Sequence, residues 1–364
     1  MRKIFVIAAS IPAILSSQQP TDTATHVSFG GFVDSYYAWD FNRPSRLDRA
    51  FAGDVPFTTQ PARHNEFNVN LAYIEAKLDA PRAHGRIALQ AGTSVQSNYS
   101  GEPAKGAISG PSLARHLQEA FAGVHLGDKT WIDGGIFYSH MGMESWASRD
   151  NPTYSRSLVA EYSPYYSAGV RGIFQATPKL TARIDVVNGW QNISENNTGK
   201  GIGARLDYAF NSNASGSYYN FFSKEAGNRL RTFNGVGARA TQGKTTLLGQ
   251  LDFGAQARST ASNSTASWWG FAGIARYAVS PQAAVSARIE RYVDRDQVIV
   301  ATGIAGRPLE VTSGSLGLDV SPVSRIIWRT EVRGFTNHRA VFLERTDGTT
   351  KNDSFVVTSL AASF

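Results

Sequence analysis

The sequence predicts an all-β chain: a transmembrane, antiparallel, up-and-down β-barrel of about 16 strands. Three observations carry this prediction. Apolar and polar residues alternate along segments of about ten residues, short turns alternate strictly with long polar loops, and the composition is unusual. The 364 residues include 34 glycines and 11% aromatic residues but only 18% charged residues, against about 25% charged in soluble domains. The mean hydropathy is −0.25, so the chain is not apolar overall.

The same composition excludes several other classes of protein. The chain has no cysteine, which excludes disulfide scaffolds and cysteine-ligated metal or iron–sulfur sites. A helical membrane protein needs runs of about 18 apolar residues, and the mature chain has none. A disordered chain would be poor in aromatic residues. A soluble secreted β-sandwich remains as an alternative.

The N-terminus predicts export. Arg2 and Lys3 precede an apolar stretch over residues 4–15, and small residues follow at Ser16 and Ser17. This order is typical of a secretory signal peptide. We expect it to cover residues 1–20, with cleavage between residues 16 and 25, and residues 26–364 to form a single barrel domain. A buried N-terminal strand is the alternative. An exported chain without cysteine fits the bacterial envelope.

The strands are predicted from a period of two residues. Within residues 181–186, Ala182, Ile184 and Val186 fall on one face, while Arg183 and Asp185 fall on the other. The apolar faces are modest and rich in alanine, which suits lipid outside the barrel and water inside it. The same pattern recurs around Arg205, Arg288 and Arg329.

The connections predict the strand count. Seven short turns alternate with eight longer polar stretches, so fifteen connections join sixteen strands and both ends lie on the short-turn side, which is periplasmic in bacterial barrels. The count changes by two if residues 155–162 pair as strands. The turns are 80–83, 127–129, 177–179, 211–213, 241–243, 280–282 and 321–323. The loops are 42–63, 96–112, 139–163, 192–198, 223–230, 259–265, 294–310 and 337–351.

Aromatic residues mark the predicted strand ends and the last strand. Residues 355–364 form a final strand that ends in Phe364, the usual ending of assembled outer-membrane barrels. Other aromatic residues are expected in two interfacial girdles. These are Tyr36, Tyr37, Trp39, Tyr138, Trp190, Tyr208, Tyr218, Trp268, Trp269, Tyr277 and Trp328. Ordinary core aromatics are the alternative.

Several short motifs resemble a known family. They include residues 31–37 in the first strand, residues 131–135, and a run in the middle third of the chain that contains Asn151-Pro152, residues 154–157 and residues 187–190. With these motifs the sequence resembles the OmpL-like β-barrel porins of Gram-negative outer membranes, from about residue 27 to the C-terminus. The resemblance implies an outer-membrane barrel with a pore role, and it transfers no binding residues.

A diffusion pore needs a water-filled lumen whose charges set ion preference. The alternation places nine arginines and seven acids on the lumen face, an excess of two cations that predicts weak anion preference. Pairs of these residues that neutralise each other as wall struts are an equal alternative. The predicted pore-lining residues are Arg86, Arg171, Arg183, Arg205, Arg239, Arg276, Arg288, Arg329, Arg333, Asp133, Asp185, Asp207, Asp252, Glu290, Asp319 and Glu331.

The long stretch 139–163 after the fifth strand is a candidate constriction loop, because loops of this length are often functional. We expect it to fold into the lumen and to place acids opposite the arginines. An external loop packed on the rim is the alternative. The residues chosen for this role are Glu144, Trp146, Asp150 and Arg156.

The function predicted from sequence is a passive diffusion channel for small hydrophilic solutes or ions, with outer-membrane lipid around it, as a homotrimer or a monomer. A surface adhesin or structural barrel is the alternative, and a barrel hydrolase using Ser139 and His140 is less favoured. No nucleic acid, cofactor or metal is predicted, although distant strands could bring scattered histidines together. The glycines of residues 235–240 resemble a dinucleotide fingerprint, but they are better explained as strand glycines.

Overall fold

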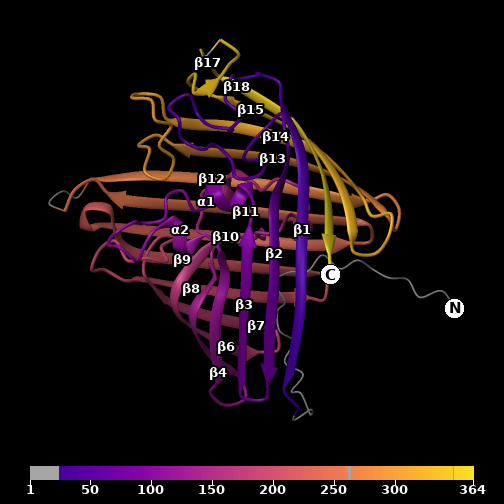
Figure 1. Cartoon of the computed structure of the whole chain (residues 1–364). Helices are drawn as coiled ribbons and strands as arrows, with labels where there is room; N and C mark the ends of the chain where they lie inside the picture. The colour runs from indigo at the N-terminus through magenta and orange to yellow at the C-terminus, as the bar shows by residue number, and fades with distance from the viewer. Residues whose placement is uncertain (1–23, 261–263, 347) are drawn as a thin grey trace.

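The computed structural model describes residues 24–260, 264–346 and 348–364, so the predicted signal peptide lies outside the described residues. In the described residues, sixteen antiparallel strands form a closed barrel, as predicted (Figure 1). The strands are β1 (His26–Asp40), β2 (Phe67–Ala80), β3 (Ala83–Ala91), β4 (Leu117–His125), β5 (Thr130–Tyr138), β6 (Tyr166–Thr177), β7 (Leu180–Val187), β8 (Gly201–Asn211), β9 (Ala214–Glu225), β10 (Arg229–Gln242), β11 (Thr245–Ala257), β12 (Thr265–Ala278), β13 (Ala283–Asp294), β14 (Leu309–Val320), β15 (Ile326–Asn337) and β18 (Asn352–Ser363).

The long connections carry the remaining elements. Residues 155–162 do not pair as strands, because part of this segment forms a short helix. Among the described residues, no helix has the length and apolar character needed to cross a membrane. The elements outside the barrel wall are α1 (Thr93–Asn98), α2 (Pro111–Ala114), η1 (Ser148–Asp150), α3 (Leu158–Glu161), η2 (Ala226–Asn228) and the small hairpin of β16 (Phe342–Leu343) and β17 (Thr349–Thr350).

The barrel closes between its first and last strands. β1 pairs with β18 in a continuous register from Phe32 opposite Ser363 to Asp40 opposite Phe355. The terminal residue Phe364 continues this pairing: its amide donates to the carbonyl of Gly31 at 3.1 Å, and its carbonyl accepts from Gly31 at 2.9 Å. Figure 1 shows the indigo β1 beside the yellow β18. Closure leaves no unpaired strand edge in the membrane.

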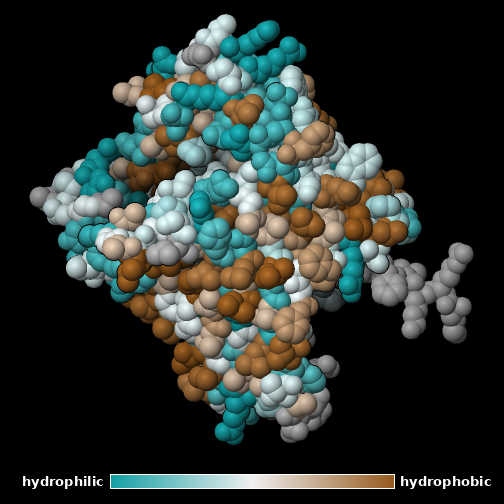
Figure 2. Space-filling view, in the orientation of Figure 1, coloured by the Kyte–Doolittle hydropathy of each residue, from teal (hydrophilic) through white to brown (hydrophobic). Residues whose placement is uncertain are grey.

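The two faces of each strand differ as the period-two pattern predicts. Large apolar side chains on the outer face are exposed, for example Ile289 at 61% and Leu316 at 69%, while the inward neighbours Arg288 and Glu290 are buried. Figure 2 shows brown apolar side chains over the strands and teal polar ones gathered at the top, around β17. The outer face is therefore suited to contact lipid.

The predicted aromatic girdles are correct only in part. Tyr208, Tyr277 and Trp328 are exposed on the outer face, but Tyr36 and Trp268 are buried inside the barrel. Successive residues of a strand point to opposite faces. Of two adjacent aromatic residues, such as 36 and 37 or 268 and 269, only one can therefore face lipid.

Candidate functional site

The connection between β5 and β6, residues 139–165, lies inside the barrel, and we call it the inner loop. It hydrogen-bonds to side chains of five strands that are spread around the barrel wall. A segment can reach all of these strands at once only from the interior of the closed barrel. The five wall residues are Asp34 on β1, Asp185 on β7, Gln250 on β11, Glu290 on β13 and Glu331 on β15.

Three wall arginines hold the middle of the inner loop by its carbonyl oxygens. Nη1 of Arg288 donates to the carbonyl of Ser155 at 2.6 Å. The wall of β13 and β15 therefore binds backbone dipoles of the inner loop. The other contacts of this kind join Arg333 to the carbonyl of Arg156 at 2.9 Å, and Arg329 to the carbonyls of Ser148 and Asn151.

The same wall carries a buried cluster of two arginines and two glutamates. Arg288 contacts Glu331 at 2.9 Å and Glu290 at 3.2 Å, and Arg333 contacts Glu290 at 2.6 Å. All four side chains have 0% exposure. Each glutamate also accepts an amide hydrogen of the inner loop at 2.6 Å. Because the loop amides bind the glutamates, the cluster and the inner loop stabilise each other. Loss of one charged partner would leave a buried charge uncompensated.

The first limb of the inner loop is fixed through His140. Its Nδ1 lies 3.0 Å from a carboxylate oxygen of Asp185, and its Nε2 lies 2.7 Å from the carbonyl of Asn220. Arg205 donates to the carbonyl of His140 at 2.8 Å. A Cβ on Gly203 would lie 2.2 Å from the imidazole ring, so only glycine at this wall position admits the histidine.

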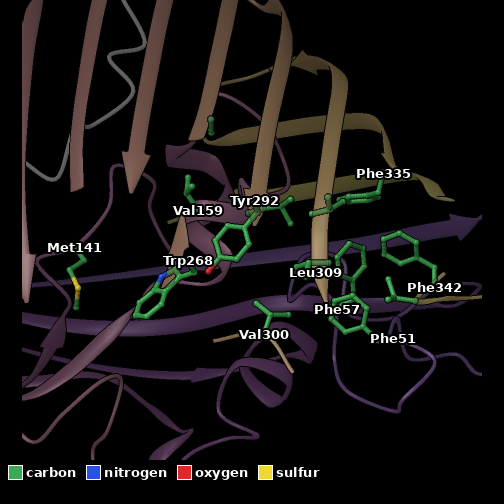
Figure 3. Packing of buried hydrophobic residues seen from close by; sticks show 14 of the residues in the cluster. Phe51, Phe57, Met141, Val159, Trp268, Tyr292, Val300, Leu309, Phe335 and Phe342 are labelled. Atoms are coloured by element: carbon green, nitrogen blue, oxygen red, sulfur yellow. The ribbon is translucent and has the colours of Figure 1, made fainter. Parts of the chain in front are cut away.

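A second long connection, residues 41–66, packs onto the inner loop. The amide of Thr59 donates to Glu161 at 2.8 Å, and Arg156 contacts the same carboxylate at 3.2 Å. Next to these contacts, four aromatic rings pack together (Figure 3). The two connections therefore pack against each other inside the barrel. The four rings are those of Phe51, Phe57, Phe335 and Phe342.

On the other side of the inner loop lies a cavity of about 520 Å³. Asp128 and Lys129 in an exposed turn line its mouth, so the cavity reaches the short-turn end of the barrel. The inner-loop acids Glu144 and Asp150 line this cavity together with four wall arginines. These arginines are Arg171 on β6, Arg183 on β7, Arg205 on β8 and Arg239 on β10.

The four chosen loop residues lie in two places. Glu144, Trp146 and Asp150 line the cavity, and burial raises the pKa of Glu144. Ser157 donates to the Glu144 carboxylate from its amide and its hydroxyl. Arg156 is buried, and its guanidinium lies 4.6 Å from the ring centre of Trp146.

Eight of the nine predicted pore-lining arginines form ion pairs. Arg239 is different, because in the part of the chain that the structure describes no carboxylate pairs with it. The pairs are Arg86 with Glu75 and Glu119, Arg171 with Asp133, Arg183 with Asp185, Arg205 with Asp207, Arg276 and Arg329 with Asp319, Arg288 with Glu290 and Glu331, and Arg333 with Glu290.

Asp252 is the one predicted acid of this group with no arginine among its described hydrogen-bond partners. It accepts from the Tyr219 hydroxyl at 2.6 Å and from Gln250 at 2.8 Å. That these sixteen residues line a solute path stays a prediction, because Arg288, Arg333 and their glutamates are covered by the inner loop.

Comparison with known proteins identifies the family. A family model described as "Putative beta-barrel porin-2, OmpL-like" matches residues 26–364. The chain belongs to this family of OmpL-like porins. Among curated protein sequences, none matches it.

Solved structures resemble the porin in fold. The outer-membrane channel DcaP of Acinetobacter baumannii has a TM-score of 0.60 and 11% sequence identity, with 94% of this chain and 98% of that chain covered. OmpT of Vibrio cholerae has a TM-score of 0.60 and 7% identity, with 94% and 99% covered. The anion-selective porin from Comamonas acidovorans has a TM-score of 0.59 and 13% identity, with 94% and 100% covered. The family and the fold together make this porin an integral β-barrel of the outer membrane.

Sequence reasoning missed several interior residues of the porin. Glu75 and Glu119 pair with Arg86, and Asp34 accepts from Asn70 at 2.8 Å. The alternation along β2 and β4 contained the signal for the two glutamates, because both lie on the inner face beside Arg86. The loop residues that bind the barrel wall carry no such signal. A hydrogen bond between residues about 100 positions apart leaves no local pattern in the sequence.

Two further expectations concern other chemistry. The hydroxyl of Ser139 accepts from the amide of Met141, while both ring nitrogens of His140 are occupied by Asp185 and Asn220. The structure therefore does not join Ser139 and His140 in a dyad, and the porin family and fold point to a channel. Within the three described ranges, no group of three or more His, Asp or Glu side chains is placed to hold a metal ion.

Proposed function

We propose that this porin is a passive diffusion channel for small hydrophilic solutes and ions, with weak anion preference. The observation that carries the proposal is the cavity between the inner loop and the β6–β10 wall, where Arg239 has no carboxylate partner in the described structure. A low-dielectric tunnel focuses the field of such a charge and raises the local concentration of anions.

The distribution of charge supports anion preference better than the count of charged residues does. The inner face carries more acids than arginines, because the strands add to the predicted set one arginine, Arg231, and seven acids: Asp34, Asp40, Glu75, Glu119, Glu225, Asp294 and Asp353. The inward strand acids that form no ion pair with an arginine in the described residues are Asp34, Glu225, Asp252 and Asp294. They are 0% to 5% exposed and lie away from water. Arg239 is half-buried and faces the cavity. Apart from the exposed turn at the mouth, Arg239 is therefore the wall charge of the cavity that no described acid pairs with, and it is positive.

The inner loop is proposed to narrow this channel. It lies across the lumen, and its acids Glu144 and Asp150 share the cavity with the wall arginines. A transverse field of this kind orients dipolar solutes and disfavours apolar ones.

The test is planar-bilayer conductance of the refolded mature chain, with the reversal potential measured under a KCl gradient. We expect stepwise open channels and a reversal potential on the chloride side. Steps with a potential on the cation side would keep the channel and overturn the anion preference. A correctly folded, heat-modifiable barrel that gives no steps would overturn the channel itself.

A further inference from the structure

The cavity below the inner loop has one charged wall position left open. Arg171, Arg183 and Arg205 each pair with an aspartate at 2.6 to 2.9 Å, and Glu119 pairs with Arg86. Apart from the exposed turn at its mouth, Arg239 is the cavity-lining wall charge that has no partner of opposite sign in the described ranges. A partly buried guanidinium without a partner is a binding group for an anion.

Hydroxyl groups stand beside this arginine. Ser215 on β9 is the register partner of Arg239, and Ser217 is the register partner of Gly237. Both serines line the cavity. The hydroxyl of Ser217 is already hydrogen-bonded to Asp207 and Arg205, whereas no hydrogen bond joins the hydroxyl of Ser215 to another described residue. One guanidinium and one hydroxyl can therefore contact the same small anionic group.

An apolar surface lies next to the anion-binding groups. A Cβ on Gly237 would lie 2.3 Å from Cγ of Met143, so the methionine of the inner loop rests directly on this glycine. Gly237 and Arg239 are on the same face of β10, about 7 Å apart. Met141 and Trp146 continue the apolar lining. Methionine side chains adapt to ligands of different shape.

We propose that this cavity binds a small organic monocarboxylate with an apolar or aromatic body. The carboxylate contacts Arg239 and Ser215, and the body lies against Met143 and the apolar underside of the inner loop. The volume of about 520 Å³ falls within the usual range of small-molecule sites.

The charges around the cavity favour a monoanion. One open arginine compensates one negative charge, and the carboxyl of Glu144, which lines the cavity from the inner loop, disfavours a second. Inorganic anions are strongly hydrated, and the methionine and tryptophan lining does not replace their water. This inference rests on the proposed function only in that the solute enters through the channel.

The test is calorimetric titration of the refolded mature chain in detergent micelles at pH 7, with benzoate, acetate and benzamide as probes. We expect benzoate to bind about tenfold or more tightly than acetate, which has no apolar body, and than benzamide, which has no charge. Arg239→Gln should weaken benzoate binding about tenfold or more, and Arg239→Lys should weaken benzoate binding less. Some of each probe will dissolve in the detergent micelles. Because every variant is measured in the same detergent, this contribution is equal for all variants and cancels when their affinities are compared.

Arg291→Gln is the matched control, because it removes the same charge from the outer side of β13, where Arg291 contacts Thr312 at 2.8 Å. It should leave benzoate affinity unchanged. Equal affinities for acetate and benzoate, or equal losses in R239Q and R291Q, would overturn the proposed site. Binding needs no conductance, so a porin that conducts without binding benzoate refutes only this inference, and one that binds without conducting refutes only the channel.

Discussion

At the scale of single residues, the interior is built from arginines and acids that a period of two places on one face of each strand. Arg288, Glu290, Glu331 and Arg333 were all expected to face the lumen, and the structure adds that the inner loop covers them completely. Buried ion pairs of this kind stabilise little against an apolar replacement but are costly to break. An experiment that tests such a pair should therefore replace only one of its two residues, because that leaves the other charge buried without a partner.

Glu331→Gln should strongly destabilise the barrel interior. It removes the charge that faces Arg288 at 2.9 Å in a site with 0% exposure, and breaking a buried pair costs about 3–5 kcal/mol. The measurement is the temperature at which the folded, heat-modifiable band is lost. Glu310→Gln is the control, because its partner Arg295 is 72% exposed, where a pair contributes about 1 kcal/mol or less. Equal effects of the two variants would contradict the buried cluster.

Glu144 should make anion preference depend on pH. Burial raises the pKa of Glu144 above its ordinary value of 4.5, so this carboxyl takes up a proton earlier than exposed carboxyls as the pH falls from 7. The cavity then loses a negative charge, and the chloride-to-potassium permeability ratio should rise between pH 7 and pH 5. In Glu144→Gln the ratio should start high and stay flat. A flat wild type, or the same slope in both proteins, would speak against this role.

At the scale of elements, strands and loops were predictable to different degrees. Turn residues such as those at 127–129 and 280–282 have local backbone preferences, so the alternation of connections located all sixteen strands. The path of the inner loop depends on hydrogen bonds from Ser148 to Asp34 and from Leu158 to Glu290, residues more than 100 positions away. Such contacts form only after the barrel closes, and no local pattern encodes them.

A cysteine pair tests the position of the inner loop. The chain has no cysteine of its own, and the hydroxyl of Ser148 lies 2.8 Å from the carboxylate of Asp34. We expect Ser148→Cys with Asp34→Cys to form a disulfide under mild oxidation, seen as a mobility shift that a reductant reverses. Ser148→Cys with Ser35→Cys is the control, since residue 35 faces outward. Cross-linking in the control pair alone would place the loop outside the barrel.

At the scale of the whole molecule, the closed barrel encloses the inner loop, and under the proposed function this loop decides which solutes pass. Composition, alternation and the terminal Phe364 were enough to predict the barrel and its membrane. They were not enough to predict that residues 41–66 pack on one side of the inner loop while a cavity lies on its other side, toward the short turns. Packing decides which face of the inner loop meets residues 41–66 and which faces the cavity. Packing of this kind leaves no periodic pattern in the sequence.

The most direct test of the proposed channel is the single-channel conductance of a porin that lacks residues 144–153, compared in the same bilayer with the same chain without the deletion. This segment carries Glu144, Trp146 and Asp150 on the cavity side of the inner loop. Deletion of the exposed residues 104–108 in the connection between β3 and β4 is the matched control. We predict a larger conductance for the first deletion and an unchanged one for the second. An unchanged conductance in both would contradict an inner loop that narrows the channel.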